Sequence, residues 1–150
     1  MNEEEQIKKA RYKVTQLLSR REHSVSELVQ KLSTTGIPMA IAEDVVSQFT
    51  AKHIQSDLRY AESVVNSAFN KGKGTLYVAQ KLQANNIEFS SVQTYIQEEG
   101  FDWYALAAEV RAKRFGDDLP TDWSLIQKQK RFLAQRGFEH EQINTIFGSL

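Results

Sequence analysis

Three stretches of this chain carry the same apolar pattern at a nearly constant spacing. The first, SVSELVQKLSTTGI, occupies residues 24–37; GTLYVAQKLQANNI follows fifty residues later, and LIQKQKRFLAQRGF follows after fifty-one more. A fixed spacing kept on both sides of a loop indicates one supersecondary unit used three times. The apolar residues that stand in register are Leu32, Leu82 and Leu133; Ile37, Ile87 and Phe138; Ala42, Val92 and Ile143; Val46, Ile96 and Phe147.

Each unit reads as three helices. In the first unit, apolar residues recur at helical spacing over residues 6–21, a second helix follows Ser24, and a third presents Ile41, Val45 and Phe49. We therefore expect an all-α fold of about nine helices in three three-helix repeats, at residues 1–54, 55–101 and 102–150. One such unit buries too little apolar surface alone, so the repeats should pack end to end in an elongated array that offers extended surfaces to macromolecules.

Local signals refine this expectation. Trp103 and Trp123 are predicted to be core anchors rather than platforms on which nucleic-acid bases stack, because each buries a large apolar ring. Capping boxes, in which two side chains satisfy free backbone N–H groups at a helix start, are predicted for Ser24 with Glu27 and for Ser90 with Gln93.

Composition excludes several classes of protein. The absence of cysteine removes disulfides, thiolate metal sites and cysteine nucleophiles, and fits a reducing compartment. The charged start, MNEEEQIKKARYK, is not a signal peptide, and no apolar run approaches the roughly 18 residues of a membrane span. Because 19 basic residues balance 19 acidic ones, any basic surface has to be local.

No pattern indicates catalysis, a metal or a cofactor. His23, His53 and His140 share no motif spacing and fall in different linkers or helix ends. The glycines at 72 and 74 lack the strand and the longer pattern of a phosphate-binding loop, so a flexible basic turn is the favoured interpretation. Adjacent carboxylates, as at 98–99 and 117–118, do not face each other on a helix. We therefore expect a protein that is not an enzyme.

Basic residues cluster in the last third of the chain. One group lies at a helix end and the next group on the following helix, where residues 123–138 contain no acid. Two interpretations stay open: a positive patch for DNA phosphates or an acidic protein surface, or basic residues that oppose helix dipoles. The two groups are Arg111, Lys113 and Arg114, then Lys128, Lys130, Arg131 and Arg136.

Several segments, taken in order, resemble the signatures of one family. They are REHSVSELVQKL at 21–32, DLRYA at 57–61, KGKG at 71–74, LPT at 119–121, Lys128, and RFLAQRGF at 131–138. Each is weak alone, but the ordered set is specific and covers nearly the whole chain. It resembles the RecX regulatory proteins. One departure is Gln55, where the family usually has leucine; we interpret it as a packing difference.

The resemblance implies a cytoplasmic bacterial modulator of the recombinase RecA, built of tandem three-helix repeats. Such a protein binds in the groove of the RecA–DNA filament and limits its extension, which lowers ATP hydrolysis, coprotease activity and strand exchange. Recombination, DNA repair and the SOS response would be modulated as a result. The resemblance also implies contact with single- and double-stranded DNA. We expect a monomer with no cofactor and no membrane attachment.

The predicted contacts to acidic filament surface or to DNA are all basic side chains. A stand-alone DNA-binding helical module that acts through the same basic helices is the alternative. The predicted contact residues are Lys71, Lys73, Arg111, Lys113, Arg114, Lys128, Lys130, Arg131 and Arg136.

Overall fold

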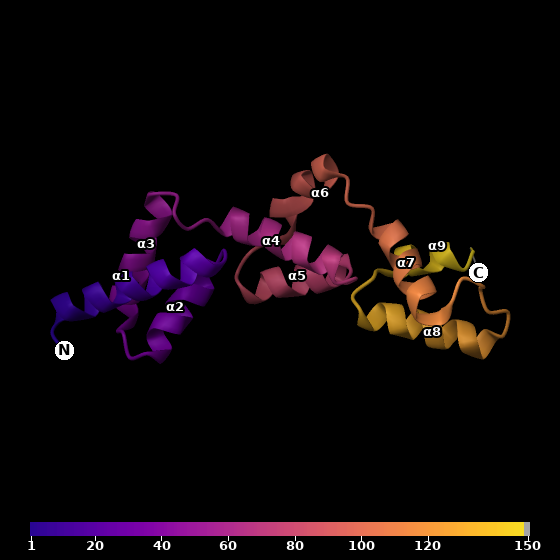
Figure 1. Ribbon diagram of the computed structural model, residues 1–150, viewed down its shortest axis with the longest axis horizontal. Helices are drawn as coiled ribbons and strands as arrows, with labels where there is room; N and C mark the ends of the chain where they lie inside the picture. The colour runs from indigo at the N-terminus through magenta and orange to yellow at the C-terminus, as the bar shows by residue number, and fades with distance from the viewer. Residues whose placement is uncertain (149–150) are drawn as a thin grey trace. The chain divides into compact units, whose positions relative to one another are not determined.

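The computed structural model describes residues 1–148, which contain nine α-helices, one short 3₁₀ helix and no strand (Figure 1). The predicted all-α fold of about nine helices is therefore confirmed within these residues. In chain order the elements are α1 (Glu3–Arg20), α2 (Val25–Thr34), α3 (Met39–Ala51), α4 (Asp57–Asn70), α5 (Thr75–Ala84), the 3₁₀ helix η1 (Phe89–Val92), α6 (Gln93–Glu99), α7 (Trp103–Phe115), α8 (Trp123–Gln135) and α9 (His140–Ile146).

The helices pack into two compact units. The N-terminal unit comprises Met1–Ser63 with Ala84–Ile87, and the C-terminal unit comprises Val64–Gln83 with the described residues from Glu88 onward. This division cuts through α4, so neither unit coincides with one repeat. The repeat boundaries at 54/55 and 101/102 stay a prediction.

Helices α1, α2 and α3 enclose the core of the N-terminal unit. Burial of each valine or leucine there contributes about 1.5–3 kcal/mol. Helix α2 begins at the predicted capping box, because Ser24 Oγ accepts from Glu27 N at 3.0 Å and Glu27 Oε1 accepts from Ser24 N at 3.2 Å. That prediction is confirmed. The fully buried core residues are Ala10, Val14, Leu28, Leu32, Ala42, Val45 and Val46.

The turns that follow α2, α5 and α8 share one backbone conformation. Gly36, Asn86 and Gly137 have φ angles of 89°, 61° and 92°, in the left-handed region that glycine and asparagine tolerate best. These three residues are also equivalent in the sequence pattern, since they stand fifty and fifty-one residues apart. The repeat read from apolar spacing is therefore present in the backbone as well.

One predicted capping box is wrong. Ser90 lies inside η1, where its carbonyl accepts a backbone hydrogen bond from Gln93, and Val92 occupies the N-cap position of α6 without a side-chain cap. A capping residue needs an extended backbone, whereas the 3₁₀ helix gives Ser90 a helical one. The Ser90 hydroxyl lies 3.4 Å from the Glu88 carboxylate instead.

The two tryptophans have opposite environments. Trp103 is 6% exposed and packs with Phe69 and Phe101, at ring-centroid distances of 5.2 and 6.0 Å, as predicted for a core anchor. Trp123 is 74% exposed, so the prediction that it lies in the core is wrong. It is the first residue of α8, directly after the N-cap Asp122, and the buried positions of that helix are Gln129 and Leu133.

Candidate functional site

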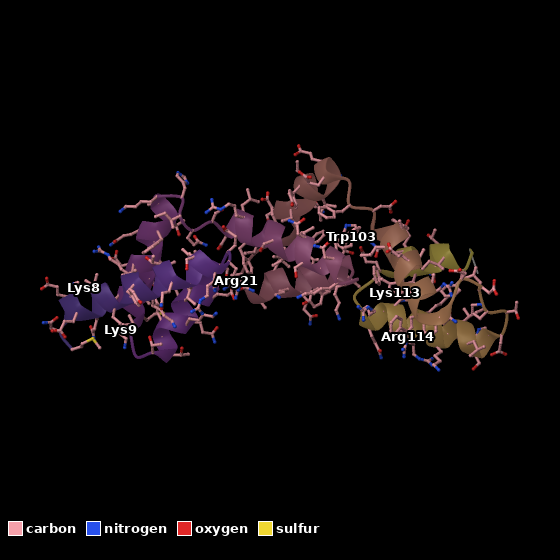
Figure 2. The ribbon with its side chains drawn as sticks, in the orientation of Figure 1. Lys8, Lys9, Arg21, Trp103, Lys113 and Arg114 are labelled. Carbon is pink, nitrogen blue, oxygen red and sulfur yellow. The ribbon has the colours of Figure 1, made fainter. Side chains whose placement is uncertain are left out.

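All nine predicted basic contact residues belong to the C-terminal unit, on α7, on α8 or its C-cap, and in the loop between α4 and α5. Figure 2 labels Lys113 and Arg114 near the end of α7. The side chains differ in exposure. Lys71, Lys113, Arg114, Lys128 and Arg131 are exposed; Lys73, Lys130 and Arg136 are half-buried; Arg111 is buried.

Arg111 cannot contact a partner in this conformation, because it is only 3% exposed. Its guanidinium donates to Gln129 Oε1 at 3.2 Å, to the Gly116 carbonyl at 2.7 Å and to the Asp117 carbonyl at 3.3 Å. The side chain thus joins α7, α8 and the loop between them. We correct its predicted role from partner contact to internal support of the third repeat.

A hollow of about 510 Å³ gathers four of the predicted basic residues. Its lining also includes the rings and aliphatic chains of Phe69, Leu106, Val110 and Phe132, and a single acid, Glu109. Cations around an apolar floor can bind anionic groups while aliphatic or ring surface is covered. The four basic residues of this hollow are Lys71, Lys113, Arg114 and Arg136.

Phe132 organises the guanidinium groups of this hollow. The guanidinium carbons of Arg114 and Arg136 each lie 5.6 Å from the centre of its ring, and Phe115 meets the ring edge-on at 5.3 Å. Cation–π contacts hold a guanidinium in place without neutralising its charge. The two arginines are therefore positioned and still able to attract an anion.

The basic surface continues along α8. A second hollow, lined by Lys128, Arg131 and Gln135, shares Arg114 and Phe132 with the first. A third hollow, between α8 and α9, is lined by Lys130 and His140 and shares Arg131 with the second. Seven of the nine predicted residues therefore line one continuous series of hollows. Lys73 lies elsewhere, with its amine 5.6 Å from the ring centre of Tyr77.

The groove between the second and third helices of a repeat occurs in both units. In the N-terminal unit, a hollow of about 830 Å³ is lined by Val29, Gln30, Met39 and Glu43, among others. Residues 101 positions later, Lys130, Arg131, His140 and Asn144, line the hollow between α8 and α9. The same position in the repeat is thus apolar and weakly acidic in one unit and basic in the other.

Ion pairing also differs between the units. Within residues 1–148, the salt bridges join Arg21 to Glu27 at 2.8 Å and Arg59 to Glu22 at 3.2 Å, and both lie in the N-terminal unit. In the described part of the C-terminal unit, none of the nine predicted basic residues lies within ion-pair distance of a carboxylate. Among these residues, Arg114 and Arg136 lie over the ring of Phe132, and Arg136 also donates to backbone carbonyls; such contacts leave the positive charge uncancelled.

Arg136 has a structural role as well. Its Nε donates to the Gly72 carbonyl at 3.1 Å and its Nη2 to the Lys71 carbonyl at 2.9 Å, where α4 ends. Nearby, Gly74 N donates to the Arg136 carbonyl and Leu76 N to the Gly137 carbonyl, both at 2.9 Å. The start of α5 is thereby fixed against the end of α8, and the Arg136 bonds hold the loop residues of the first basic hollow against the end of α8.

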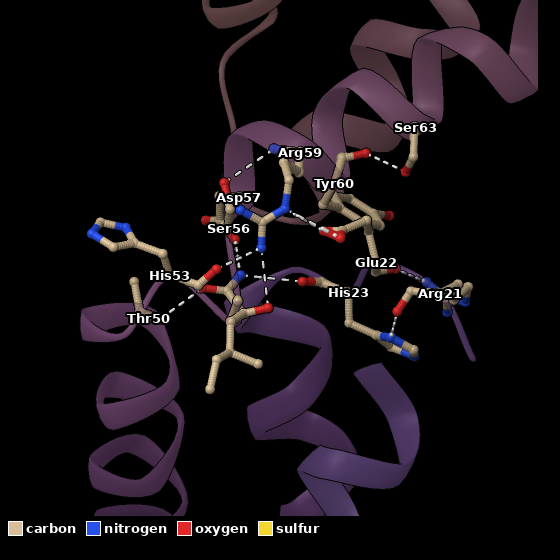
Figure 3. A network of polar contacts seen from close by, with 12 residues as sticks. Arg21, Glu22, His23, Thr50, His53, Ser56, Asp57, Arg59, Tyr60 and Ser63 are labelled. Atoms are coloured by element: carbon tan, nitrogen blue, oxygen red, sulfur yellow. Dashed lines mark hydrogen bonds and ion pairs between the residues drawn. The ribbon is translucent and has the colours of Figure 1, made fainter. Parts of the chain in front are cut away.

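A buried polar network in the N-terminal unit joins the segment before α2 to the linker between α3 and α4 (Figure 3). Gln55 is 1% exposed; its Nε2 donates to the His23 carbonyl at 3.1 Å and to Asp57 Oδ1 at 2.9 Å. Its Oε1 accepts from the Thr50 hydroxyl at 2.6 Å. The interpretation of Gln55 as a packing difference missed this network; a polar residue in a family position for leucine was the available signal.

Two titratable groups near this network, His23 and Glu27, have shifted pKa values. Burial lowers the pKa of His23, whose Nδ1 lies 3.0 Å from the Arg21 carbonyl. Burial acts to raise the pKa of Glu27, but hydrogen bonds from the Arg21 guanidinium and Ser24 N outweigh it and hold that pKa below its usual value. Both groups have structural partners, and no set of three or more metal-ligating side chains is grouped within residues 1–148.

No helix in the described residues has the length and apolar character needed to cross a membrane. Two features of the described residues are available to a partner: the basic hollows of the C-terminal unit and the exposed Trp123 at the start of α8. Sequence reasoning misses the exposure of Trp123, because an apolar residue type does not by itself imply burial.

Comparison with known proteins gives consistent matches along the chain. The family described as "RecX, first three-helix domain" matches residues 10–49, "RecX, second three-helix domain" matches residues 56–90, and "RecX, third three-helix domain" matches residues 102–147. The predicted tandem array of three-helix repeats is confirmed by these matches.

Matches to individual RecX proteins cover most of this chain and most of each relative. Regulatory protein RecX of Acinetobacter baylyi is 37% identical over 127 residues, which cover 85% of this chain and 79% of that protein. Regulatory protein RecX of Vibrio cholerae is 37% identical over 133 residues, covering 89% and 88%. The crystal structure of RecX from Lactobacillus salivarius, at 21% identity, shares the fold over 95% of both chains with a TM-score of 0.75. From the three matched repeats and the identity to full-length relatives, we conclude that this chain belongs to the RecX family of regulatory proteins.

Proposed function

We propose that this chain is a non-enzymatic, cytoplasmic regulator that binds the RecA–DNA filament in its groove and limits filament extension. ATP hydrolysis and strand exchange by RecA fall as a consequence, and recombination, DNA repair and the SOS response are modulated through the filament. Membership of a family of regulatory proteins supports the regulatory role. The choice of RecA rests on the family resemblance.

The observation that carries the proposal is the continuous basic surface of the C-terminal unit. A filament offers acidic protein surface and DNA phosphates at every subunit, and hollows lined by unpaired cations fit both. Many weak contacts made at once give avidity without one strong pocket. A bound copy that covers the site of the next recombinase subunit stops growth while disassembly continues.

Inhibition of DNA-dependent ATP hydrolysis by the recombinase tests this mechanism. A protein that caps growing ends acts when it is much scarcer than the recombinase subunits. We expect half-maximal inhibition at roughly one copy per ten recombinase subunits or fewer, since one cap blocks many additions. A requirement for one copy per subunit would contradict capping.

The alternative function is that of a stand-alone DNA-binding module, favoured by the absence of paired carboxylates beside these cations in residues 1–148. Inhibition would then result from competition for bare DNA. Binding dominated by phosphates weakens steeply with salt, with a log–log slope of about −0.9 per phosphate neutralised. Inhibition that survives a salt concentration sufficient to remove the chain from bare DNA would reject this alternative.

A further inference from the structure

The loop between α7 and α8 and the first turn of α8 expose large apolar side chains. Trp123 is 74% exposed, and Leu119 and Leu125 are each 49% exposed. A tryptophan left in water forgoes much of the stabilisation that burial of its large ring would give. Trp123 is the most exposed large apolar side chain in residues 1–148, and exposed apolar surface can mark an interaction site.

Local structure does not require tryptophan at this position. The start of α8 is capped by Asp122, whose Oδ2 accepts from Leu125 N at 3.1 Å. The inward positions of the helix are supplied by Gln129 and Leu133. Trp123 thus contributes neither the cap nor the core, and its ring is available to a partner.

The charge of this segment selects the class of partner. Asp117, Asp118 and Asp122 are exposed, and residues 116–127 contain no lysine, arginine or histidine. The carboxylates of this segment repel nucleic-acid phosphates, so stacking on a base is electrostatically disfavoured here. The same carboxylates attract lysine and arginine side chains.

We infer that Trp123 is the anchor of a docking site for a protein surface that presents an apolar pocket bordered by cationic side chains. Tryptophan is enriched among the residues that dominate binding at protein interfaces, and a charged rim sets orientation and partner choice. The partner to be tested is a recombinase subunit in the filament, and this choice of partner rests on the proposed function. The chain then uses its basic hollows and this acidic, apolar segment for different parts of the partner.

The test compares Trp123→Ala with Tyr12→Ala, a control that removes an aromatic ring of similar exposure, 67%, from α1. Binding of each variant to the recombinase–DNA filament and to bare single-stranded DNA is measured by titration. We expect Trp123→Ala to bind the filament at least about tenfold more weakly, with binding to bare DNA unchanged within about twofold. Tyr12→Ala should match the unaltered chain in both assays.

Each other outcome overturns part of the account. Filament binding that Trp123→Ala leaves unchanged overturns this inference alone. An equal loss of filament and bare-DNA binding identifies Trp123 as a base-stacking residue and overturns the choice of a protein partner. Failure of the unaltered chain to bind the filament overturns the proposed function and this inference together.

A second variant tests the charge of the site without touching the helix cap. Asp117→Asn with Asp118→Asn should weaken filament binding about threefold at low salt, and the difference should disappear at high salt because exposed charges are screened. Circular dichroism of all variants, matched to the unaltered chain, establishes that the fold is intact. A filament affinity that is unchanged at low salt would overturn the cationic border of the partner's pocket.

Discussion

In each unit, the start of the second helix of one repeat contacts the turn after the second helix of the next repeat. Side chains form this contact in the N-terminal unit, and backbone groups form it in the C-terminal unit. In the N-terminal unit, the start of α2 meets the turn after α5 through side chains: Ser24 Oγ donates to Asn85 Oδ1 at 2.6 Å, and Asn86 Nδ2 donates to Ser26 Oγ at 2.8 Å. In the C-terminal unit, the start of α5 meets the turn after α8 through backbone groups, around Gly74 and Gly137.

This comparison shows that the repeat constrains the position of the junction and not the residue types that form it. Residues 24, 26, 85 and 86 correspond to residues 74, 76, 136 and 137 by the repeat spacing, so the docking position is the same at both junctions. A polar junction depends on satisfied hydrogen bonds, whereas a glycine junction depends on the absence of Cβ atoms. The closer backbone approach occurs in the unit that carries the basic hollows.

The largest expected effect is at the glycine junction. A Cβ on Gly137 would lie 2.7 Å from both the backbone N and the Cβ of Tyr77. Because backbone atoms cannot give way, we expect Gly137→Ala to destabilise the C-terminal unit by about 3 kcal/mol or more, measured by urea unfolding.

The matched control is Gly36→Ala at the equivalent turn of the first repeat. Gly36 has nearly the same φ angle, 89° against 92°, but a Cβ there would meet nothing within 4 Å. This control should lose only the roughly 1–2 kcal/mol that a left-handed conformation costs an alanine. Equal losses for the two variants would show that the φ angle, and not close approach, explains the glycine junction.

The buried polar network around Gln55, which includes the His23 carbonyl just before the polar junction, should respond less strongly. Gln55→Leu removes one donor group and one acceptor and leaves the His23 carbonyl and the Thr50 hydroxyl without this buried partner. We expect a loss of about 1–3 kcal/mol in the stability of the N-terminal unit, since unsatisfied buried polar groups are costly. Gln83→Leu, at an exposed helical position, is the control. If Gln55→Leu leaves the stability of the N-terminal unit unchanged or raises it, the hydrogen bonds of Gln55 do not stabilise the unit and the residue only fills space.

The smallest expected effect is the pH dependence of stability that His23, a member of the same network, contributes. The pKa of His23 is lowered in the folded chain, so the unfolded chain binds more protons as the pH falls below about 6.5. Stability should therefore be full above pH 6.5 and decline as the pH falls from there toward the lower folded pKa. Glu27, whose pKa is lowered from 4.5, adds its own loss only at more acidic pH.

His23→Gln isolates this contribution, because the replacement is neutral at every pH. Its unfolding midpoints in urea at pH 7, 6 and 5 should vary less than those of the unaltered chain. A pH dependence as steep as that of the unaltered chain would remove His23 as its source.

Much of the fold follows from sequence because it depends on local signals. The repeat spacing predicts the helices, and Ser24 with Glu27 predicts a helix start that needs only neighbouring residues. Ser90 with Gln93 has the same spacing, but the backbone at Ser90 is helical, which the spacing alone does not report. A cap is thus predictable only when the backbone before the helix is extended.

The site was harder to predict because it depends on tertiary partners. The two basic groups of the last third lie on α7 and on or directly after α8, as the helical pattern predicts, but Arg111 is buried by carbonyls of a loop whose shape the sequence does not give. A signal was present, since Arg111 lies four residues after buried Ala107 and eight after buried Trp103, on the inward face of α7. Trp123 illustrates the reverse error, since an apolar residue type was equated with burial.

The central claim is that the basic surface of the C-terminal unit carries the regulatory contact, and a pair of charge reversals tests it most directly. Lys128→Glu with Arg131→Glu alters two exposed residues of the basic hollows, and Lys8→Glu with Lys9→Glu makes the same change in net charge on exposed positions of α1 (Figure 2). Inhibition of recombinase ATP hydrolysis is measured for both. We predict that the first variant requires at least about tenfold more protein for half-maximal inhibition and the second less than about twofold more. Equal effects of the two variants, or full inhibition by the first, would contradict the claim.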